Sequence, residues 1–168
     1  MSKAEFNHRE LKLEEAIEYF LTQDGGYQKG DPSSYNKDLA LDTKTLLTFI
    51  QSTHPKEWER YSNIYGYSAE KALLERFCKE VRQLGLIRIL RQGITDRGIK
   101  FRLAFFRPET DLNEQTQELY EKNIHICTRQ LHYSTRNNNS LDMVLFLNGI
   151  PIATLELKDQ FSGQDVNK

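Results

Sequence analysis

The sequence has few of the features that mark secreted or membrane-spanning proteins. Its 168 residues include two cysteines, Cys78 and Cys127, which are too few for a disulfide framework and do not form a CxxC pair. The longest purely apolar run has five residues, Met143 to Leu147, and is too short to cross a bilayer. The first residues also lack the apolar core of a secretory signal. We therefore expect a cytoplasmic protein with no membrane association.

No charge of one sign dominates either. The chain has 23 Lys and Arg against 24 Asp and Glu, and the net charge of −1 argues against wholesale electrostatic binding of nucleic acid. The charges are unevenly distributed, however, because residues 85–108 carry six basic side chains and one acidic side chain. This pattern allows a local basic surface, although solvated charge on strands and loops is its commoner cause.

Several catalytic and cofactor-binding motifs are absent. The sequence contains no GxSxG, GxGxxG or GxxxxGK[ST] pattern, so no ATP site is expected within it. The four histidines lack HExxH or any other paired metal-binding spacing.

Hydrophobic periodicity predicts helices before a β-rich region. Helices are predicted over residues 9–22, 44–52, 69–84 and 113–121, and strands over 86–90, 101–106, 124–131 and both sides of Asn148-Gly149. The aromatic residues between positions 58 and 67 are predicted to form a packed connection. We expect one α/β domain over residues 1–168, with a mixed central sheet flanked by helices, as a fragment of a longer protein.

The region from Leu141 to Lys158 carries the strongest chemical signal. Asn148-Gly149 predicts a hairpin, with Asp142 at its start and Glu156 and Lys158 at its end. Two carboxylates can hold a hard cation that polarises a phosphate, and a nearby lysine can offset developing negative charge. The alternative is that these side chains are ordinary solvated polar positions.

The length of the hairpin loop decides whether these groups share a face. A two-residue loop would place Asp142 on the face opposite Glu156, whereas a three-residue loop or a bulge would bring the two together. We therefore predict a three-residue loop or a bulge.

A further carboxylate comes from the helix predicted over residues 69–84. Helical projection places Glu70 on the buried stripe with Leu73 and Phe77, where it could be another ligand or an orienting group. The alternative is a first-turn glutamate that is favoured by the helix dipole.

The stretch RQLHYSTRNNNSLDMVLFLNGIPIATLELK, Arg129 to Lys158, resembles the N-terminal nuclease domain of type I restriction enzyme R subunits, which are motor subunits. AEKALLERFCKEVRQLGLIRILRQGITDRGIKFRLAFFRP, the early DGGY with LLTFIQSTHPKEW, and the late SGQD resemble the same family, so the similarity covers nearly the whole chain.

This resemblance implies a PD-(D/E)xK restriction-endonuclease-like fold and Mg²⁺-dependent double-strand cleavage of DNA, with Mn²⁺ as a substitute. It implies that Asp142 and Glu156 are metal ligands, that Lys158 is the catalytic lysine and that Glu70 is the helix carboxylate. Leu141 departs from the family pattern, which has proline there. The family's glutamine–tyrosine element is also expected to lie after Lys168, because Gln164 is followed four residues later by lysine.

The resemblance also implies partners. They are double-stranded DNA and the methyltransferase and specificity subunits of a restriction-modification complex, in which ATP and S-adenosylmethionine serve the full assembly and not this segment. Lys100, Arg129 and Arg136 are candidate phosphate contacts. Two other interpretations stay open: a non-cleaving DNA-binding or subunit-docking module of the same fold, and an unrelated α/β domain with solvated hairpin charges.

Overall fold

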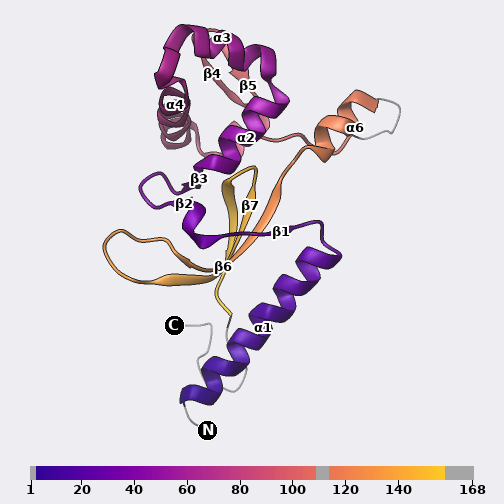
Figure 1. Cartoon of the computed structure of the whole chain (residues 1–168), viewed down its shortest axis with the longest axis vertical. Coiled ribbons are helices and arrows are strands. Elements are labelled where there is room, and N and C mark those ends of the chain that lie inside the picture. The colour runs from indigo at the N-terminus through magenta and orange to yellow at the C-terminus, as the bar shows by residue number, and fades with distance from the viewer. Residues whose placement is uncertain (1–2, 109–113, 158–168) are drawn as a thin grey trace. The chain divides into compact units, whose positions relative to one another are not determined.

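The computed structural model describes residues 3–108 and 114–157, and the side chains from residue 11 onward. The chain forms two compact units, each made of segments that are distant in the sequence (Figure 1). The first unit comprises residues 1–40, 125–146 and 151–168, and the second comprises residues 41–124 and 147–150.

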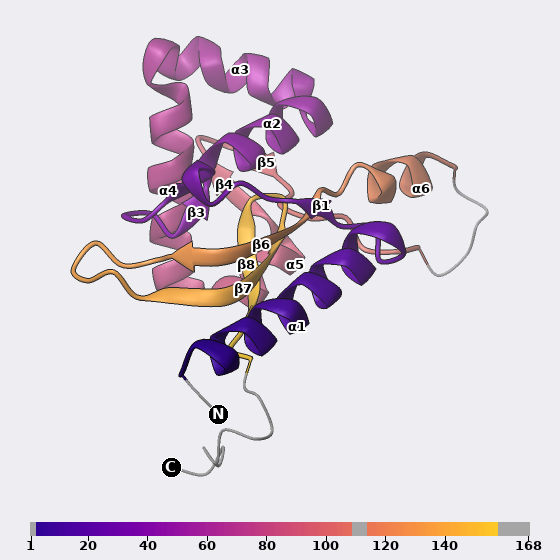
Figure 2. The same cartoon turned by 60° about the horizontal axis from the view of Figure 1, so that its bottom comes forward.

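A mixed sheet and one long helix make up the first unit. Its elements are α1 (Lys3–Gln23), β1 (Gln28–Lys29), the 3₁₀ helix η1 (Pro32–Ser34), β2 (Tyr35–Asn36), β6 (His125–His132), β7 (Ser140–Leu147) and β8 (Ile150–Leu155). The sheet has the order β1-β6-β7-β8, with β1 parallel to β6. Helix α1 packs against β1 and β6, as Figure 2 shows. The predicted α/β class with a mixed sheet is therefore confirmed.

Apolar side chains of β6 and β7 form the core of this unit. Leu131, Val144 and Phe146 are buried together, because alternate side chains of neighbouring strands meet on one face of a sheet. Tyr35 packs on them, with its ring in an edge-to-face contact 6.1 Å from the ring of Phe146.

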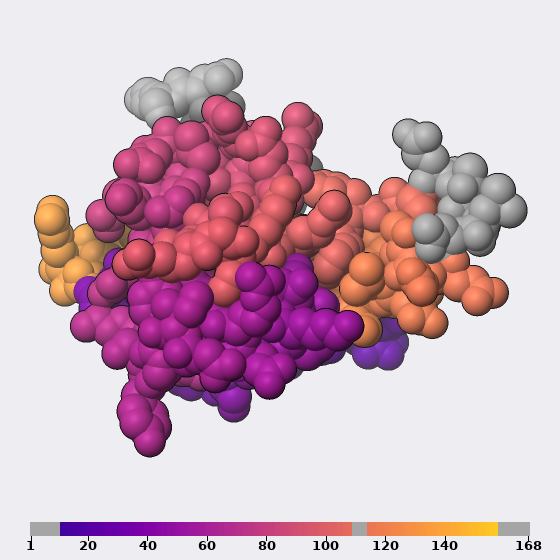
Figure 3. All heavy atoms as spheres, turned by 90° about the horizontal axis from the view of Figure 1, so that it is seen from above, coloured from indigo at the N-terminus to yellow at the C-terminus, as the bar shows by residue number. Residues whose placement is uncertain are grey.

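The second unit is mostly helical. Its elements are β3 (Leu41–Asp42), α2 (Thr43–Thr53), α3 (Pro55–Tyr65), the 3₁₀ helix η2 (Gly66–Ser68), α4 (Ala69–Leu84), α5 (Leu86–Gln92), β4 (Ile94–Asp96), β5 (Ile99–Phe101) and α6 (Glu114–Glu121). Asp42 caps α2 by accepting a hydrogen bond from the backbone N–H of Thr45. Strands β4 and β5 form an antiparallel hairpin, which packs against α3 and α4. Figure 3 shows the pink hairpin segment lying against the purple α2–α3 segment.

Three local predictions for the second unit were wrong. Residues 86–90 lie in helix α5 and not in a strand; Gly85, with a φ of 81°, ends α4, and Gly93, with a φ of 77°, ends α5. An apolar run this short fits a buried strand or one helical turn equally well. The strand predicted over 101–106 reaches only Phe101, and the aromatic segment around Trp58 and Tyr61 lies in α3.

Helix α1 covers the predicted residues 9–22, starts earlier at Lys3, and buries acidic side chains. Glu14 and Glu18 are buried, whereas Leu13 is 43% exposed and Phe20 is 63% exposed. The helix therefore packs on the sheet through acidic side chains, whose partners are described below.

Candidate metal centre at the end of the hairpin

Asp142 lies near the start of β7 and is half-buried. Its Oδ2 accepts a hydrogen bond of 2.6 Å from the backbone N–H of Leu157, just beyond the end of β8. Glu156 immediately precedes Leu157 and is exposed. The structure thus brings the Asp142 carboxylate beside the peptide that joins residues 156 and 157. Lys158 lies outside the described residues.

The hairpin turn has two residues, so the predicted three-residue loop or bulge is wrong, and strand pairing does not place Asp142 and Glu156 on one face as that prediction required. Asn148 and Gly149 form the turn, with φ values of 54° and 81°. Two successive positive φ values are typical of a type I′ turn, whose twist matches that of the flanking strands. Regular pairing from this turn places Asp142 opposite Leu155, the last residue of β8. Because β8 ends there, strand alternation no longer dictates the face of Glu156.

The turn has two residues because the Asn148 side chain makes hydrogen bonds to backbone groups of the second unit. The Asn148 Oδ1 accepts from the backbone N–H of Ile124 at 2.7 Å, and its Nδ2 donates to the Leu103 carbonyl at 2.9 Å. The backbone N–H of Asn148 donates to the Ile124 carbonyl at 2.7 Å. Gly149 lies so close to the backbone of Asp42 that a Cβ would stand 2.3 Å from its carbonyl oxygen. A longer loop would break these contacts.

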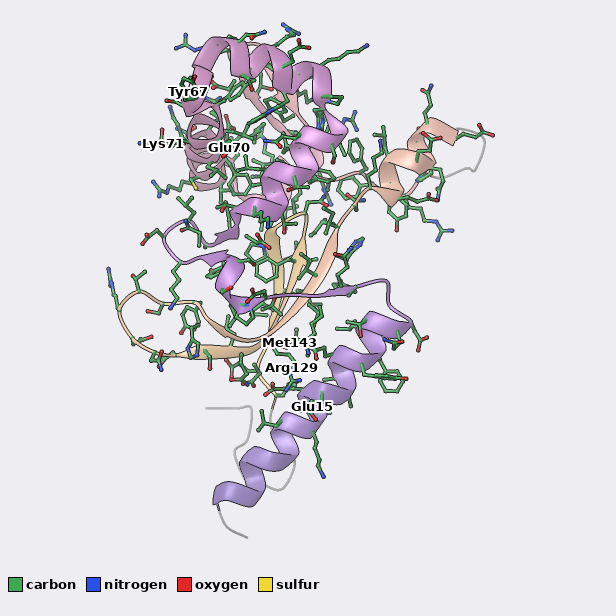
Figure 4. All side chains as sticks on the ribbon, viewed as in Figure 1. Glu15, Tyr67, Glu70, Lys71, Arg129 and Met143 are labelled. Carbon is green, nitrogen blue, oxygen red and sulfur yellow. The ribbon has the colours of Figure 1, made fainter. Side chains whose placement is uncertain are left out.

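Glu70 is not on the buried stripe, and that prediction was wrong. It is exposed in the first turn of α4, where the Gln51 amide approaches its carboxylate at 3.5 Å (Figure 4). The buried stripe of α4 begins at Ala69 and continues through Leu73 and Phe77. Ala69 occupies the inward position of the first turn, so Glu70 is rotated away by about 100°. Glu70 belongs to the second unit, whereas Asp142 belongs to the first.

Arg129 is held by acidic side chains of α1. Its guanidinium lies 3.2 Å from Glu14 and 3.4 Å from Glu18, and Figure 4 shows it near Glu15 as well, at 3.8 Å. Burial lowers the pKa of Arg129, but the two buried glutamates outweigh this effect, so its pKa is raised. Sequence reasoning missed Glu14 and Glu18. Their i,i+4 spacing on a helix was the available signal.

The other two candidate phosphate contacts are exposed. Arg136 lies in the connection between β6 and β7, and Lys100 lies on β5 opposite Thr95. Neither has an ion-pair partner among the side chains of residues 11–108 and 114–157, which are those that the structure describes. These two side chains are therefore available to solvent, whereas Arg129 is already paired.

The family described as "Type I restriction enzyme R protein N terminus" matches residues 7–168. The chain belongs to this family. No curated protein and no solved structure gives a match.

Asp142 and Glu156 offer the carboxylate oxygens that a magnesium ion takes from proteins. Two carboxylates are what Mg²⁺ commonly takes from a protein, because water and substrate phosphates complete its coordination. In the part of the chain that the structure describes, no three His, Cys, Asp or Glu side chains gather into a larger metal site. The described helices also include none that is long and apolar enough to span a membrane.

Proposed function

We propose that this chain is a Mg²⁺-dependent DNA endonuclease domain with a PD-(D/E)xK fold, which makes double-strand breaks within a type I restriction-modification complex. Family membership over residues 7–168 supports a restriction role. The hydrogen bond from the backbone N–H of Leu157 to Asp142 supports the proposed centre most directly, because Leu157 directly follows Glu156.

Asp142 and Glu156 would hold the metal. When bound there, Mg²⁺ would polarise a backbone phosphate and acidify a water molecule. The hydrogen bond from Leu157 occupies only Oδ2 of Asp142, so Oδ1 keeps its acceptor capacity. Glu156 is exposed, which leaves its carboxylate open to an ion and a substrate from solution.

Lys158 would supply the positive charge of the site. A lysine ammonium can position the attacking water or offset the negative charge that develops on the phosphate. Glu70 is not among the proposed ligands, because its carboxylate is approached instead by the Gln51 amide at 3.5 Å. Arg136 and Lys100 are proposed to contact DNA phosphates, whereas Arg129 would hold α1 to the sheet.

The decisive measurement is a calorimetric Mn²⁺ titration at neutral pH. We expect binding by the unmodified chain and its loss in Asp142→Ala. Asp142→Asn should lose binding too, although its amide oxygen can still accept from Leu157, which separates ligand loss from local unfolding. Asp24→Ala removes an exposed carboxylate elsewhere and should bind Mn²⁺ normally.

Two further results complete the test. Lys158→Ala should keep the fold and Mn²⁺ binding but abolish DNA cleavage by the assembled restriction complex. Identical titrations of the unmodified chain and both Asp142 variants would contradict the proposed centre. Such a result would favour the non-cleaving DNA-binding or docking module.

A further inference from the structure

A hollow of about 570 Å³ lies at the corner where α4 is followed by α5. The residues that line it include Leu84 at the end of α4, Gly85 at the corner, and Ile87, Arg88 and Arg91 on α5. These residues all belong to the second unit, in which α5 packs against α4 (Figure 2). The hollow is therefore formed within one unit.

Gly85 gives the corner its shape. Its φ of 81° is a backbone conformation that other residues rarely adopt, and a Cβ built on it would meet no atom within 4 Å apart from its chain neighbours. The N–H of Gly85 donates to the Val81 carbonyl at 2.9 Å, and its carbonyl accepts from the N–H of Ile89 at 3.3 Å. Both backbone groups at the corner are thus engaged, so a ligand of the hollow is recognised by side chains.

Two apolar side chains of the hollow are exposed. Ile87 is 70% exposed and Leu84 is 40% exposed. Single exposed apolar residues are ordinary on protein surfaces, but these two are three positions apart and line the same hollow. Helix α5 is already anchored by Ile89, which is fully buried. The exposed pair is therefore free to serve as the apolar floor of a binding site.

Two arginines accompany this apolar floor. Arg88 and Arg91 are exposed, and Arg91 follows Ile87 by one helical turn on the same face of α5. The Nε of Arg88 donates to Gln92 at 3.1 Å, which leaves the terminal N–H donors of its guanidinium. Neither arginine forms an ion pair with another side chain of residues 11–108 and 114–157. The hollow thus combines apolar surface with two uncompensated positive charges.

This combination fits a protein partner better than a nucleic acid or a small molecule. Phosphate contacts use charged and polar groups and would leave Ile87 in water, whereas protein interfaces combine arginine with an apolar centre. A small-molecule pocket encloses most of its ligand, but this hollow is open at a corner between two helices. A partner must therefore bring apolar side chains and acidic side chains together.

Helix α6 of a second copy does not have this pattern. Its exposed carboxylates, Glu114, Glu118 and Glu121, are spaced i, i+4 and i+7 and so share one face of the helix. The apolar side chains of Leu119 and Tyr120 are half-buried instead of lying exposed beside those acids. A purely acidic face could pair with the arginines but would leave Ile87 uncovered.

We propose that the hollow between α4 and α5 binds an acidic amphipathic helix of another protein. The apolar side chains of that helix lie over Leu84 and Ile87, and its carboxylates pair with Arg88 and Arg91 through charge-assisted hydrogen bonds. This binding goes beyond the nuclease function and does not depend on it, because the proposed metal ligands lie in the first unit.

The test is peptide binding by the 168-residue chain, measured by fluorescence anisotropy. The probe is a labelled helical peptide of about 18 residues, or about five turns, with leucines spaced i, i+3, i+4 and i+7 and glutamates at the other positions. A second peptide has the same composition, but its leucines are spread evenly around the helix. The site variants are Ile87→Gln and Arg88→Gln/Arg91→Gln.

Exposed residues of α3 provide matched control variants. Ile64→Gln replaces an isoleucine that is 53% exposed, and Lys56→Gln/Arg60→Gln removes two positive charges from exposed positions. Each site variant should bind the amphipathic peptide about tenfold more weakly, whereas each control should stay within about twofold of the unmodified chain. Thermal unfolding should be the same for all four variants, since each replaced side chain is exposed. No binding of the amphipathic peptide, equal binding of the two peptides, or equal effects of site and control variants would each overturn the proposal.

Two further measurements test other occupants of the hollow. If duplex DNA displaces the peptide, and its own binding falls in Arg88→Gln/Arg91→Gln but not in Ile87→Gln, the hollow is a phosphate-binding surface and the proposal is wrong. Sedimentation velocity tests a second copy of the chain. Self-association that is lost in Ile87→Gln would assign the hollow to that copy and overturn the proposal, whereas a monomer whose peptide binding resists DNA supports it.

Discussion

At the scale of single residues, Asn148 both forms the hairpin turn and bonds to buried groups through its side chain. Its sequence neighbour Gly149 predicts a hairpin, and both residues adopt the positive φ values that a type I′ turn requires. The side chain is fully buried, and its amide bonds to Ile124, Leu103 and Asn123. An asparagine here therefore does what a glycine could not, because it satisfies buried backbone groups of the second unit.

We predict that Asn148→Ala lowers the free energy of unfolding by about 3 kcal/mol, because buried backbone groups lose their partners. Asn148→Gly tolerates the positive φ but also lacks the amide, so it should recover only the backbone part of this loss, about 1 kcal/mol. Urea unfolding of both variants measures the effect. Asn139→Ala, at an exposed position, should stay within about 0.5 kcal/mol of the unmodified chain. A loss in Asn148→Ala as small as in this control would contradict the anchoring role.

At the scale of elements, an ionic network attaches α1 to the sheet. Arg129 of β6 pairs with Glu14 and Glu18 of α1, and Lys29 of β1 lies 2.9 Å from Glu18. The Gln130 amide also donates to Glu14 at 2.8 Å. Buried charges are tolerated only when they are paired and hydrogen-bonded, so the helix and the strands depend on each other here.

We predict that Arg129→Met destabilises the chain by about 3–5 kcal/mol, since it leaves the buried carboxylate of Glu14 without its charge partner. Replacing the partners as well, in Arg129→Met/Glu14→Leu/Glu18→Leu, should recover most of the loss, because no buried charge is left unpaired and Lys29, which loses Glu18, is exposed. Thermal unfolding of both variants provides the comparison. A triple variant as unstable as Arg129→Met would show that the network's charge is not the cause.

At the scale of the whole molecule, stability against acid should depend on the second unit. His54 is buried there, and its Nε2 accepts a hydrogen bond of 3.0 Å from the backbone N–H of Arg102. An acceptor nitrogen must be unprotonated, so the folded state requires neutral His54. Burial lowers the pKa of His54, and the charge of Glu57 opposes this only in part.

The lowered pKa of His54 sets the direction in which stability changes with pH. The unfolded chain takes up a proton on His54 near pH 6.5, before the folded chain does. We therefore predict that this contribution to stability is complete above about pH 6.5 and is lost as the pH falls from there toward the folded-state pKa. Urea unfolding at several pH values tests this, with His54→Gln as the variant that should lose this part of the pH dependence. His132→Gln, at an exposed histidine, should keep it. Identical pH profiles for His54→Gln and the unmodified chain would contradict the prediction.

The sequence predicted the elements with strong local signals. The helix over residues 69–84 was confirmed to the residue, and the helices near 44–52 and 113–121 were confirmed with small shifts of their ends. The helix predicted over 9–22 was also found, but it starts earlier, at Lys3. Strand β6 and the Asn-Gly hairpin lie where the alternation of apolar side chains and the Asn-Gly pair predicted them. Short apolar runs were less informative, because a run such as 86–90 can be buried in either kind of element.

The sequence predicted only part of the candidate centre. Residue type and order identified Asp142, Glu156 and Lys158 as one group, and the family match covers all three. The loop length could not be predicted, because it depends on where the second unit binds the Asn148 side chain. The exposure of Glu70 could not be predicted either, since it depends on which side of α4 meets the rest of its unit.

By itself, the sequence determined the α/β class, the positions of the long helices and of the hairpin, and the family, because these follow from local periodicity, turn chemistry and a long specific motif. Only the tertiary structure decided which charges are paired. Arg129 and the hairpin residue Arg97 are both arginines, yet one is held by buried glutamates and the other is exposed. The physical reason is that ion pairing depends on distances between side chains far apart in the sequence, and chain folding alone sets those distances.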